Sequence, residues 1–320
     1  MQTTVLVIGY PTQTQTKHQI KHLQQAGAQV IVIDPYGDEG TYASLAWEQE
    51  RLIWAEQALP FSTLNSVLLC ANAPEYPTEA AFQTQQPPHL SWEDWFQHYG
   101  TQRDRSDSLL SLVLTLEQLG IPCFNPPSKS QLSRRKPYQL HLMRSVGCQL
   151  PQTLITNDAT AAANFIKQQG ACIVKPAAGG SLTLSANALL EQDELKHLAA
   201  PAIFQQRIRG RDIRVVVIEG EVVSSAIIDI AEDTLDFRGD STYQQGKAHY
   251  IEVTLPQEVI AQCQRAAQVV GLRLAGIDIR VTPDHEYFLL ECNSSPIYLD
   301  VEYKLGHPIT KSLVNALTAK

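Results

Sequence analysis

Residues 275–293 alternate apolar and polar side chains so regularly that they are expected to fold as a β-hairpin. We place the turn at Asp284 and His285. Counting outward from this turn pairs Pro283 with Glu286, Val281 with Phe288, Ile279 with Leu290 and Asp278 with Glu291. One face then carries Ile277, Ile279, Val281, Phe288, Leu290 and Cys292, and the other carries Asp278, Arg280, Thr282, Tyr287, Glu291 and Asn293. The apolar face predicts a buried core, and the polar face predicts a functional surface.

The polar face brings the carboxylates of Asp278 and Glu291 directly opposite each other. The Cβ atoms of such a pair lie about 4.5–5.5 Å apart, so the two charges repel unless a cation lies between them. With Asn293 they form an oxygen-only donor set, which suits a hard cation such as Mg²⁺, with Mn²⁺ as a substitute, and leaves coordination positions for water and phosphate. The alternative is an exposed face whose carboxylates pair with Arg280 or Lys247.

The N-terminal part is expected to form a small doubly wound α/β domain, because its strand, helix and strand patterns follow each other as a β-α-β unit. Residues 72–105 are rich in Pro, Gln and aromatic residues and show no period, so they are predicted as a long ordered loop. The other expected elements are strands at 5–9, 29–34, 67–70 and 121–125, helices at 14–26 and 106–119, and helical spacing through Leu45, Ile53 and Leu59. Pro126 and Pro127 then mark a domain boundary.

Beyond that boundary the patterns predict α+β structure. The expected elements are helices at 134–146, 159–169 and 255–270, strands at 153–156 and 171–176, and a hairpin of 214–218 and 221–228 that turns at Glu219 and Gly220.

Composition excludes several classes of protein. The chain has 25 Lys and Arg against 33 Asp and Glu, and its net charge of −8 argues against a broad nucleic-acid or anionic-membrane footprint. Its longest apolar stretch, residues 109–116, is far shorter than the ~20 residues of a membrane span. The first residues lack the features of a secretory signal, and the six cysteines form no Cys-x-x-Cys pair. We therefore expect a cytoplasmic protein with reduced thiols and no nucleic-acid or membrane partner.

The strand that carries Glu291 ends in a recognisable motif, because residues 291–296 read Glu-Cys-Asn-Ser-Ser-Pro. This run matches the end pattern Glu-x-Asn-x-Ser-Pro of the RimK-like branch of the ATP-grasp ligases, which the chain resembles in several further motifs. The other matching segments lie upstream in the family's order: a helix with Lys136, a strand with Lys175, a hinge at 205–210, Asp-Ile-Arg at 212–214 and Asp-Phe-Arg at 236–238. The motifs span residues 133–306, whereas residues 1–125 resemble the family only in general layout.

This resemblance implies an α/β fold that becomes α+β in its C-terminal part. An N-terminal α/β domain, 1–127, would precede an ATP-grasp fold of two α+β subdomains, a central one at 128–204 and a Mg-nucleotide one at 205–320, with ATP between them. The implied metal ligands are Asp278, Glu291 and Asn293, and the implied catalytic residues are Arg238, Lys175 and Arg280. The residues implied to bind ATP are Lys136, Lys175, Gly179, Gly180, Ser181, Gln205, Gln206, Arg207, Ile208, Asp212, Arg238 and Leu290.

These roles have physical counterparts. The ammonium groups of Lys136 and Lys175 are point charges on flexible stems and suit phosphate oxygens. Arg238 would stabilise a transferring phosphoryl group, and Asp212 would accept bonds from ribose hydroxyls. The structural alternatives are surface lysines, an ion pair of Arg238 with Asp236 or Asp240, and a pairing of Asp212 with Arg214.

The activity that the resemblance implies is that of an ATP-dependent carboxylate-amine ligase working through an acyl-phosphate. Members of this branch add glutamate to the tail of a protein or peptide, join small amino acids or peptides, or cyclise ribosomally made precursor peptides. We therefore expect an amino-acid or peptide substrate, with a precursor-peptide macrocyclase as the alternative, and relatives are often homo-oligomers. An acidic substrate would meet Arg207, Arg209, Arg211, Tyr298 and Tyr303, unless these arginines are solvated surface.

Two departures from the family pattern motivate a third hypothesis. Residues 177–183 hold two adjacent glycines where the family usually has several spaced ones, and Gln206 stands where many relatives have Glu. Both are compatible with a regulatory protein that binds nucleotide without turnover.

Overall fold

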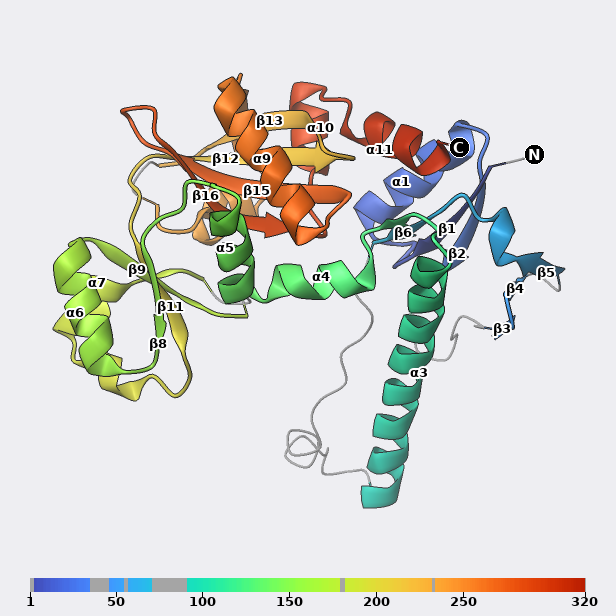
Figure 1. Cartoon of the computed structure of the whole chain (residues 1–320), viewed down its shortest axis with the longest axis horizontal. Helices are drawn as coiled ribbons and strands as arrows, with labels where there is room; N and C mark the ends of the chain where they lie inside the picture. Colours follow the sequence, from blue (N-terminus) through green and yellow to red (C-terminus); the bar gives the residue numbers. More distant parts are fainter. Residues whose placement is uncertain are drawn as a thin grey trace. The chain divides into compact units, whose positions relative to one another are not determined.

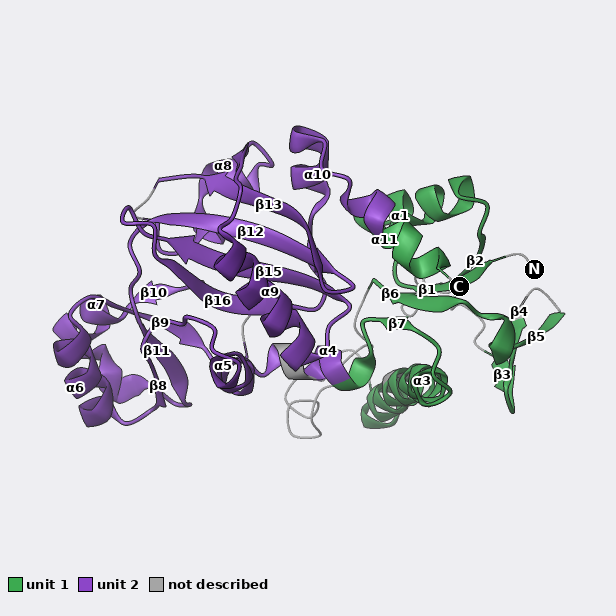
Figure 2. Cartoon of the chain, turned by 45° about the horizontal axis from the view of Figure 1, so that its top comes forward, with its two compact units in different colours: residues 1–128, 313–320 green, residues 129–312 purple. Residues whose placement is uncertain are grey.

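The computed structural model describes residues 3–34, 46–54, 57–70, 91–178, 182–231 and 234–319. The chain divides into two units, Met1–Ser128 with Leu313–Lys320, and Lys129–Ser312 (Figure 2). Within the described ranges, no helix combines the length and the apolar character needed to cross a membrane. The expected partition into three domains, at 127 and 204, stays a prediction.

The first unit is built on a parallel sheet between helices (Figure 1). Its strands lie in the order β2 (Gln29–Ile33), β1 (Thr4–Ile8), β6 (Ser66–Leu69) and β7 (Cys123–Phe124). All five residues of β1 are buried, which is typical of a central strand covered on both faces. The unit's helices include α1 (Thr14–Gln25) and α3 (Trp92–Gln118), and α3 packs Leu112 and Leu116 into the core. The predicted α/β class is confirmed for this unit.

The helical spacing predicted around Ile53 and Leu59 is wrong. This region is an antiparallel sheet of β3 (Ala46–Glu48), β4 (Arg51–Trp54) and β5 (Gln57–Pro60). Leu52 pairs with Leu59 across β4 and β5, and buried Leu52 is followed by exposed Ile53, which is the two-residue period of a strand. Leu45 lies outside the described residues.

The loop predicted at 72–105 is wrong from Ser91 onward, because α3 begins at Trp92 rather than at residue 106. The Ser91 hydroxyl accepts the Asp94 N–H at 3.1 Å and caps the helix, and Glu93 and Asp94 lie in its first turn. The sequence Ser-Trp-Glu-Asp therefore carried a helix-start signal that the irregular composition around it concealed. Residues 72–90 lie outside the described ranges.

The second unit holds two antiparallel sheets. In the smaller one, the order is β10 (Leu184–Ser185), β9 (Cys172–Pro176), β11 (Ala202–Gln206) and β8 (Thr153–Thr156). Helices α6 (Ala159–Gln169) and α7 (Ala186–Glu191) cover it, with Ile166, Val174 and Phe204 in their common core. The predicted strands at 153–156 and 171–176 and the helix at 159–169 are confirmed.

The larger sheet has the order β14 (His249–Glu252), β13 (Glu221–Asp229), β12 (Arg211–Ile218), β15 (Leu274–Val281) and β16 (Tyr287–Asn293). Helices α5 (Lys136–Ser145) and α9 (Gln257–Val270) share a core with the apolar side chains of β12, β15 and β16. The opposite face of the sheet is left for polar side chains.

The remaining elements of the described chain are short. They are α4 (Pro127–Arg134), α8 (Ser241–Gln244), α10 (Leu299–Leu305), α11 (Ile309–Thr318) and 3-10 turns at Phe61–Thr63, Glu194–His197 and Phe237–Gly239.

The hairpin of β15 and β16 pairs Asp278 with Glu291 as predicted, but its register differs nearer the turn. A β-bulge follows Asp278, so Ile279 pairs with Leu289 and Val281 pairs with Tyr287. The observed core residue is therefore Leu289, which is fully buried, and not Leu290. Tyr287 likewise packs against the core instead of lying on the polar face. Because residues 289 and 290 are both leucine, either could fill the core position, so the alternation of apolar and polar residues did not reveal the extra residue.

Candidate functional site

The polar face of the larger sheet carries a row of charged side chains that its register brings together. Arg214 of β12, Asp278 of β15 and Glu291 of β16 are cross-strand partners. Asp212 and Arg280 form a second pair across β12 and β15. Because alternate residues of these strands enter the core, the strand period itself holds these side chains on one face.

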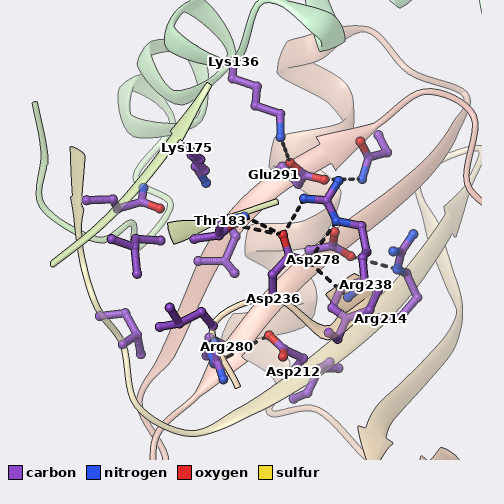
Figure 3. Close-up of a pocket in the computed structure, with 18 of the residues that line it drawn as sticks. Lys136, Lys175, Thr183, Asp212, Arg214, Asp236, Arg238, Asp278, Arg280 and Glu291 are labelled. Carbon is purple, nitrogen blue, oxygen red and sulfur yellow. Dashed lines mark hydrogen bonds and ion pairs between the residues drawn. The ribbon is translucent and has the colours of Figure 1, made fainter. Parts of the chain in front are cut away.

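A cavity of about 280 Å³ lies over this charged row (Figure 3). Thirteen of the predicted site residues line it: Lys136, Lys175, Gln205, Gln206, Arg207, Ile208, Asp212, Arg238, Asp278, Arg280, Leu290, Glu291 and Asn293. The other three, Gly179, Gly180 and Ser181, lie outside the described residues. The structure thus gathers side chains from α5, from both sheets and from the connection after β13, although their individual roles stay predictions.

Leu290 reaches the cavity because of the β-bulge. In a regular strand, Leu290 and Glu291 would point to opposite faces. The extra residue lets both line the cavity while Leu289 fills the core.

Sequence reasoning missed several other lining residues, namely Phe237, Tyr243 and Ile297, whereas the lining residue Thr183 ends the segment 177–183 that the sequence had singled out. Phe237 lies inside the Asp-Phe-Arg motif, which was a signal for its position. Tyr243 and Ile297 lie in no motif, so only the folded structure identifies them.

Glu291 is held by two neighbours. Lys136 Nζ lies 2.5 Å from Glu291 Oε2, and Asn293 Nδ2 donates to Glu291 Oε1 at 2.8 Å. Burial raises the pKa of Glu291, but Lys136 and Asn293 outweigh burial and hold that pKa below its usual range. Glu291 is therefore an ionised, acceptor-only group at the cavity wall.

Asp278 is less well satisfied than Glu291. Arg214 Nε lies 2.8 Å from Asp278 Oδ1, but its N–H is not aligned for a hydrogen bond, so this oxygen keeps lone pairs available. Burial raises the pKa of Asp278, although Arg214 opposes the shift. The cations beside the two facing carboxylates are thus Lys136 and Arg214, whereas Lys247, proposed as an alternative partner, donates to Gln245.

Lys175 is the cavity cation whose ammonium has no bonded carboxylate within the described ranges. Burial lowers the pKa of Lys175 to about 8, against the attraction of Glu291. At neutral pH this group is largely protonated and its hydrogen-bonding capacity is not taken up by a bonded carboxylate, which is the property of an anion-binding residue.

Within the described ranges, two further buried acceptors in the cavity lack hydrogen-bond partners, as Asp278 Oδ1 does. They are Gln205 Oε1 and Asp212 Oδ2, although Gln205 Nε2 donates to Thr153 Oγ1 at 3.0 Å. Burial raises the pKa of Asp212 to about 6. Unsatisfied buried acceptors cost about 1–3 kcal/mol each, so their presence points to donors that arrive with a ligand.

Arg280 has contacts that differ from those of a phosphate-binding arginine. Its guanidinium donates to the Gly210 carbonyl at 3.1 Å and to the Thr234 carbonyl at 2.8 Å, and lies 3.6 Å from Asp212. These bonds tie Arg280 to the chain at Gly210 and at Thr234. The catalytic role expected for Arg280 stays a prediction.

Of the residues expected to receive an acidic substrate, Arg207 lines the cavity and Tyr303 is 62% exposed. Tyr298 is fully buried, with its hydroxyl near Thr310, so the expectation for Tyr298 is wrong. Arg211 pairs with Asp229 at 3.0 Å.

The acidic row is the set of Arg214, Asp278 and Glu291 across β12, β15 and β16. Its oxygen donors, with Asn293, fit a metal ion whose coordination is completed by a nucleotide. Within the described ranges, no group of three or more His, Cys, Asp and Glu side chains could hold a metal by itself. Asp278, Glu291 and Asn293 offer two carboxylates and one amide oxygen on the cavity wall, which suits Mg²⁺ completed by water and phosphate.

With this geometry established, residues 133–317 match the RimK-like ATP-grasp domain. The chain belongs to the RimK-like ATP-grasp family. Its fold agrees over the whole chain with that of the ATP-grasp ligase PsnB complexed with a phosphomimetic variant of minimal precursor, Mg and ADP. That structure has a TM-score of 0.78 and 29% identity, and the match covers 100% of this chain and 99% of that chain. The predicted family and ATP-grasp fold are confirmed.

Other similar proteins differ in how much of their length is shared. The macrocyclase MdnC from Microcystis aeruginosa MRC, bound with precursor peptide MdnA, has a TM-score of 0.75 at 19% identity over 99% of this chain and 100% of its own, and so supports the fold alone. A probable alpha-L-glutamate ligase of Desulfotalea psychrophila is 30% identical over 221 residues, 66% of this chain and 46% of its own. Another, of Shewanella halifaxensis, is 27% identical over 66% of this chain and 47% of its own. The chain therefore spans about half the length of these two relatives.

Proposed function

We propose that this protein is an ATP-dependent ligase that activates a carboxylate as an acyl-phosphate and joins it to an amine. The observation that carries the proposal is the composition of the cavity lining. Lys136, Lys175 and Arg238 supply positive charge there, and Asp278 and Glu291 supply facing oxygen donors. Cations and a metal site in one cavity suit the phosphates of a nucleotide and the charge that develops during phosphoryl transfer.

The nucleotide would be held by residues of both sheets. Lys136 and Lys175 would contact phosphate oxygens, and the hinge at 205–208 together with Leu290 would enclose the adenine. The unpartnered oxygens of Gln205 and Asp212 would accept bonds from the adenine amino group and a ribose hydroxyl. Asp278, Glu291 and Asn293 would hold Mg²⁺, which would neutralise phosphate charge.

The chain's own contribution to the reaction is charge and position. A substrate carboxylate attacks the γ-phosphorus of ATP and ADP leaves; an amine then attacks the acyl carbon, phosphate leaves, and the amine gives up a proton to form the amide. Arg238, 44% exposed at its side chain, would face the transferring phosphoryl group from the mouth of the cavity. No cysteine nucleophile is required, and burial raises the pKa of Cys148, Cys263 and Cys292.

We further propose a peptide as the substrate, with a precursor-peptide macrocyclase as a specific second candidate. The likeness to PsnB covers both chains almost entirely, and PsnB is complexed with its minimal precursor in related structures. The likeness to the two glutamate ligases described above covers less than half of each of them. The six free thiols are consistent with a reducing, cytoplasmic setting, and a homo-oligomer stays a prediction.

The test is to incubate the protein with Mg-ATP, a panel of amino acids and candidate peptides, and to measure ADP release and the intact mass of each peptide. Substrate-stimulated ADP release is expected. Added residues would indicate a tailing ligase, and loss of water would indicate a cyclase. Asp278→Ala should abolish the release. Tight nucleotide binding without stimulated release from any substrate would contradict the ligase proposal and favour a regulatory nucleotide-binding protein.

A further inference from the structure

Asp236 is the most heavily bonded carboxylate at the cavity (Figure 3). Its Oδ2 accepts from the Thr183 N–H and the Thr183 hydroxyl, both at 3.1 Å, and from Arg238 Nη2 at 2.6 Å. Its Oδ1 accepts from the Arg238 N–H at 3.1 Å and from Arg238 Nε at 2.9 Å. One carboxylate, with its side chain only 8% exposed, thus binds both Arg238 and Thr183.

These bonds join the two sheets of the second unit. Thr183 directly precedes β10 of the smaller sheet, whereas Asp236 and Arg238 follow β13 of the larger sheet. Gly239 also lies beside Leu182, because a Cβ at Gly239 would be in ordinary van der Waals contact with Leu182 Cδ1, at 3.5 Å. Thr183 itself lines the cavity, so the bonded pair forms the wall next to Arg238.

The residue between Asp236 and Arg238 extends this connection to the acidic row. The Phe237 ring lies edge-on to Tyr243, with centroids 4.8 Å apart, and the Arg214 guanidinium lies 5.9 Å from the Phe237 ring. Arg214 in turn pairs with Asp278. A single segment, residues 236–238, therefore contacts the wall at Thr183, the acidic row and the cavity mouth.

We propose that Asp236 is a positioning residue that fixes Arg238 and Thr183 to each other, so that the cavity wall is in place whenever Arg238 faces the transferring phosphoryl group. This inference rests on the proposed function. The acyl-phosphate is sensitive to water, which attacks the acyl carbon, breaks the bond to the phosphate oxygen and returns the free carboxylate and phosphate. A wall held by Asp236 keeps water away from this carbon until the amine arrives.

The electrostatics of Asp236 agree with such a role. Burial raises the pKa of Asp236, but the bonds from Arg238 and from the Thr183 N–H outweigh burial and hold the pKa below its usual range. Asp236 therefore remains a charged acceptor, able to hold donors from both sides.

The bond between the sheets is tested first without any substrate, by hydrogen exchange at the Thr183 amide of the full chain. We expect this amide to be protected in the wild type and to exchange at least about tenfold faster in Asp236→Asn. Asp240→Asn is the matched control. Asp240 lies in the same connection and accepts the Thr242 and Tyr243 N–H groups at the start of α8, a cap that Asn can also provide. An unprotected Thr183 amide in the wild type, or equal exchange in Asp236→Asn, would overturn the inference.

The catalytic consequence is tested by comparing Thr183→Val with Thr183→Ser, using the peptide identified in the ligation assay. Val removes the hydroxyl bond at similar volume, whereas Ser restores it. We expect about one ADP per ligated product in the wild type and in Thr183→Ser, and a ratio several-fold higher in Thr183→Val, with KM for ATP changed less than about twofold. A merely structural role of Thr183 would lower ADP release and product together and leave their ratio at one, which would refute the inference.

The two assays also separate this inference from the proposed function. If the wild type protects the Thr183 amide but never releases ADP, the ligase proposal is refuted, and so is the role assigned to the wall. If the wild type ligates its substrate while the Thr183 amide exchanges freely, the ligase proposal stands and only the role of Asp236 is refuted.

Discussion

The acidic row, Arg214, Asp278 and Glu291, and the hinge at 205–208 line the same cavity but differ in how their polar atoms are satisfied. In the row, both carboxylates already have a cation within 2.8 Å. Within the described residues, no hydrogen-bond donor reaches Gln205 Oε1 at the hinge or Asp212 Oδ2, which lines the same cavity. Asp278 Oδ1 also lacks an aligned donor, but it lies 2.8 Å from the Arg214 cation. Ligand binding at the row must therefore replace existing ion pairs and yields little net free energy, whereas binding at the hinge satisfies atoms that now carry a penalty.

This difference separates two functions, nucleoside binding and phosphoryl transfer. We expect the hinge and Asp212 to provide most of the affinity for the nucleoside, because new bonds form there without breaking old ones. The row and the cations around it provide charge that can be redistributed, which is what phosphoryl transfer requires. The following substitutions test that division.

The largest effect is expected at Arg238, which the division assigns to the reaction rather than to binding. Arg238→Ala should lower kcat about 10²–10³-fold because transition-state charge loses its partner. The Kd for Mg-AMPPNP, measured by calorimetry, should change less than about threefold. Weaker binding of Mg-AMPPNP in proportion to the fall in kcat would show that Arg238 acts in ground-state binding, and would contradict the separation of binding from reaction.

The next effect is expected at Glu291, where the division predicts a dependence on the metal. Glu291→Gln should weaken binding of AMPPNP in the presence of Mg²⁺ about 10–100-fold, since a ligand of the ion is lost. Binding without Mg²⁺ should be equal or tighter, because Lys136 is released from its ion pair. Glu258→Gln, which alters a surface pair with Arg265, is the control and should change neither value. Equal weakening with and without Mg²⁺ would argue against a metal at the row.

Lys175 should make nucleotide binding depend on pH. Its pKa of about 8 means that the free protein loses this charge as the pH rises past 8, so that phosphate binding must then take up a proton. The Kd for Mg-AMPPNP should rise up to about tenfold per pH unit above pH 8, and this slope should vanish in Lys175→Met. A slope that persists in Lys175→Met would mean that another group titrates.

The smallest effect is expected on stability, at Asp212. Burial raises the pKa of Asp212 to about 6, so the folded state binds the proton of this carboxyl more tightly than the unfolded state does. The protonated carboxyl therefore contributes its full stabilisation below about pH 4, and this stabilisation is lost as the pH rises through 6. Asp212→Asn should therefore be more stable than the wild type by about 1–2 kcal/mol above pH 6, in urea unfolding, with the difference vanishing near pH 4. The same substitution should weaken nucleotide binding. A variant less stable at pH 7 would show that the pairing with Arg280 outweighs burial.

The sequence alone predicted the facing pair Asp278 and Glu291, although two details of the hairpin were wrong. The Thr282 N–H donates to the Glu286 carbonyl, so the turn holds three residues rather than two, and the bulge at Leu290 adds one residue to the other strand. The two displacements cancel beyond the bulge, which is why the predicted partner of Asp278 was correct while those of Ile279 and Val281 were not.

Other contacts of the site could not be derived from local patterns. Lys136 and Glu291 are 155 positions apart, and Thr183 and Asp236 are 53 apart. The first bond depends on how α5 packs on the larger sheet, and the second on how the two sheets pack. Motif order indicated that the lysines and carboxylates belong to one site. It did not indicate that a neutral oxygen of Gln205 and one of Asp212 would be buried without partners, because hydrogen-bond satisfaction is a property of the folded cavity.

The most direct test of the account is a crystal structure of the protein with Mg²⁺ and AMPPNP. We expect the phosphates to contact Lys136, Lys175 and Arg238, the metal to lie on the oxygens of Asp278, Glu291 and Asn293, and a ribose hydroxyl to donate to Asp212. A nucleotide bound elsewhere, or an intact pair of Lys136 and Glu291 with no ion at the row, would contradict the account.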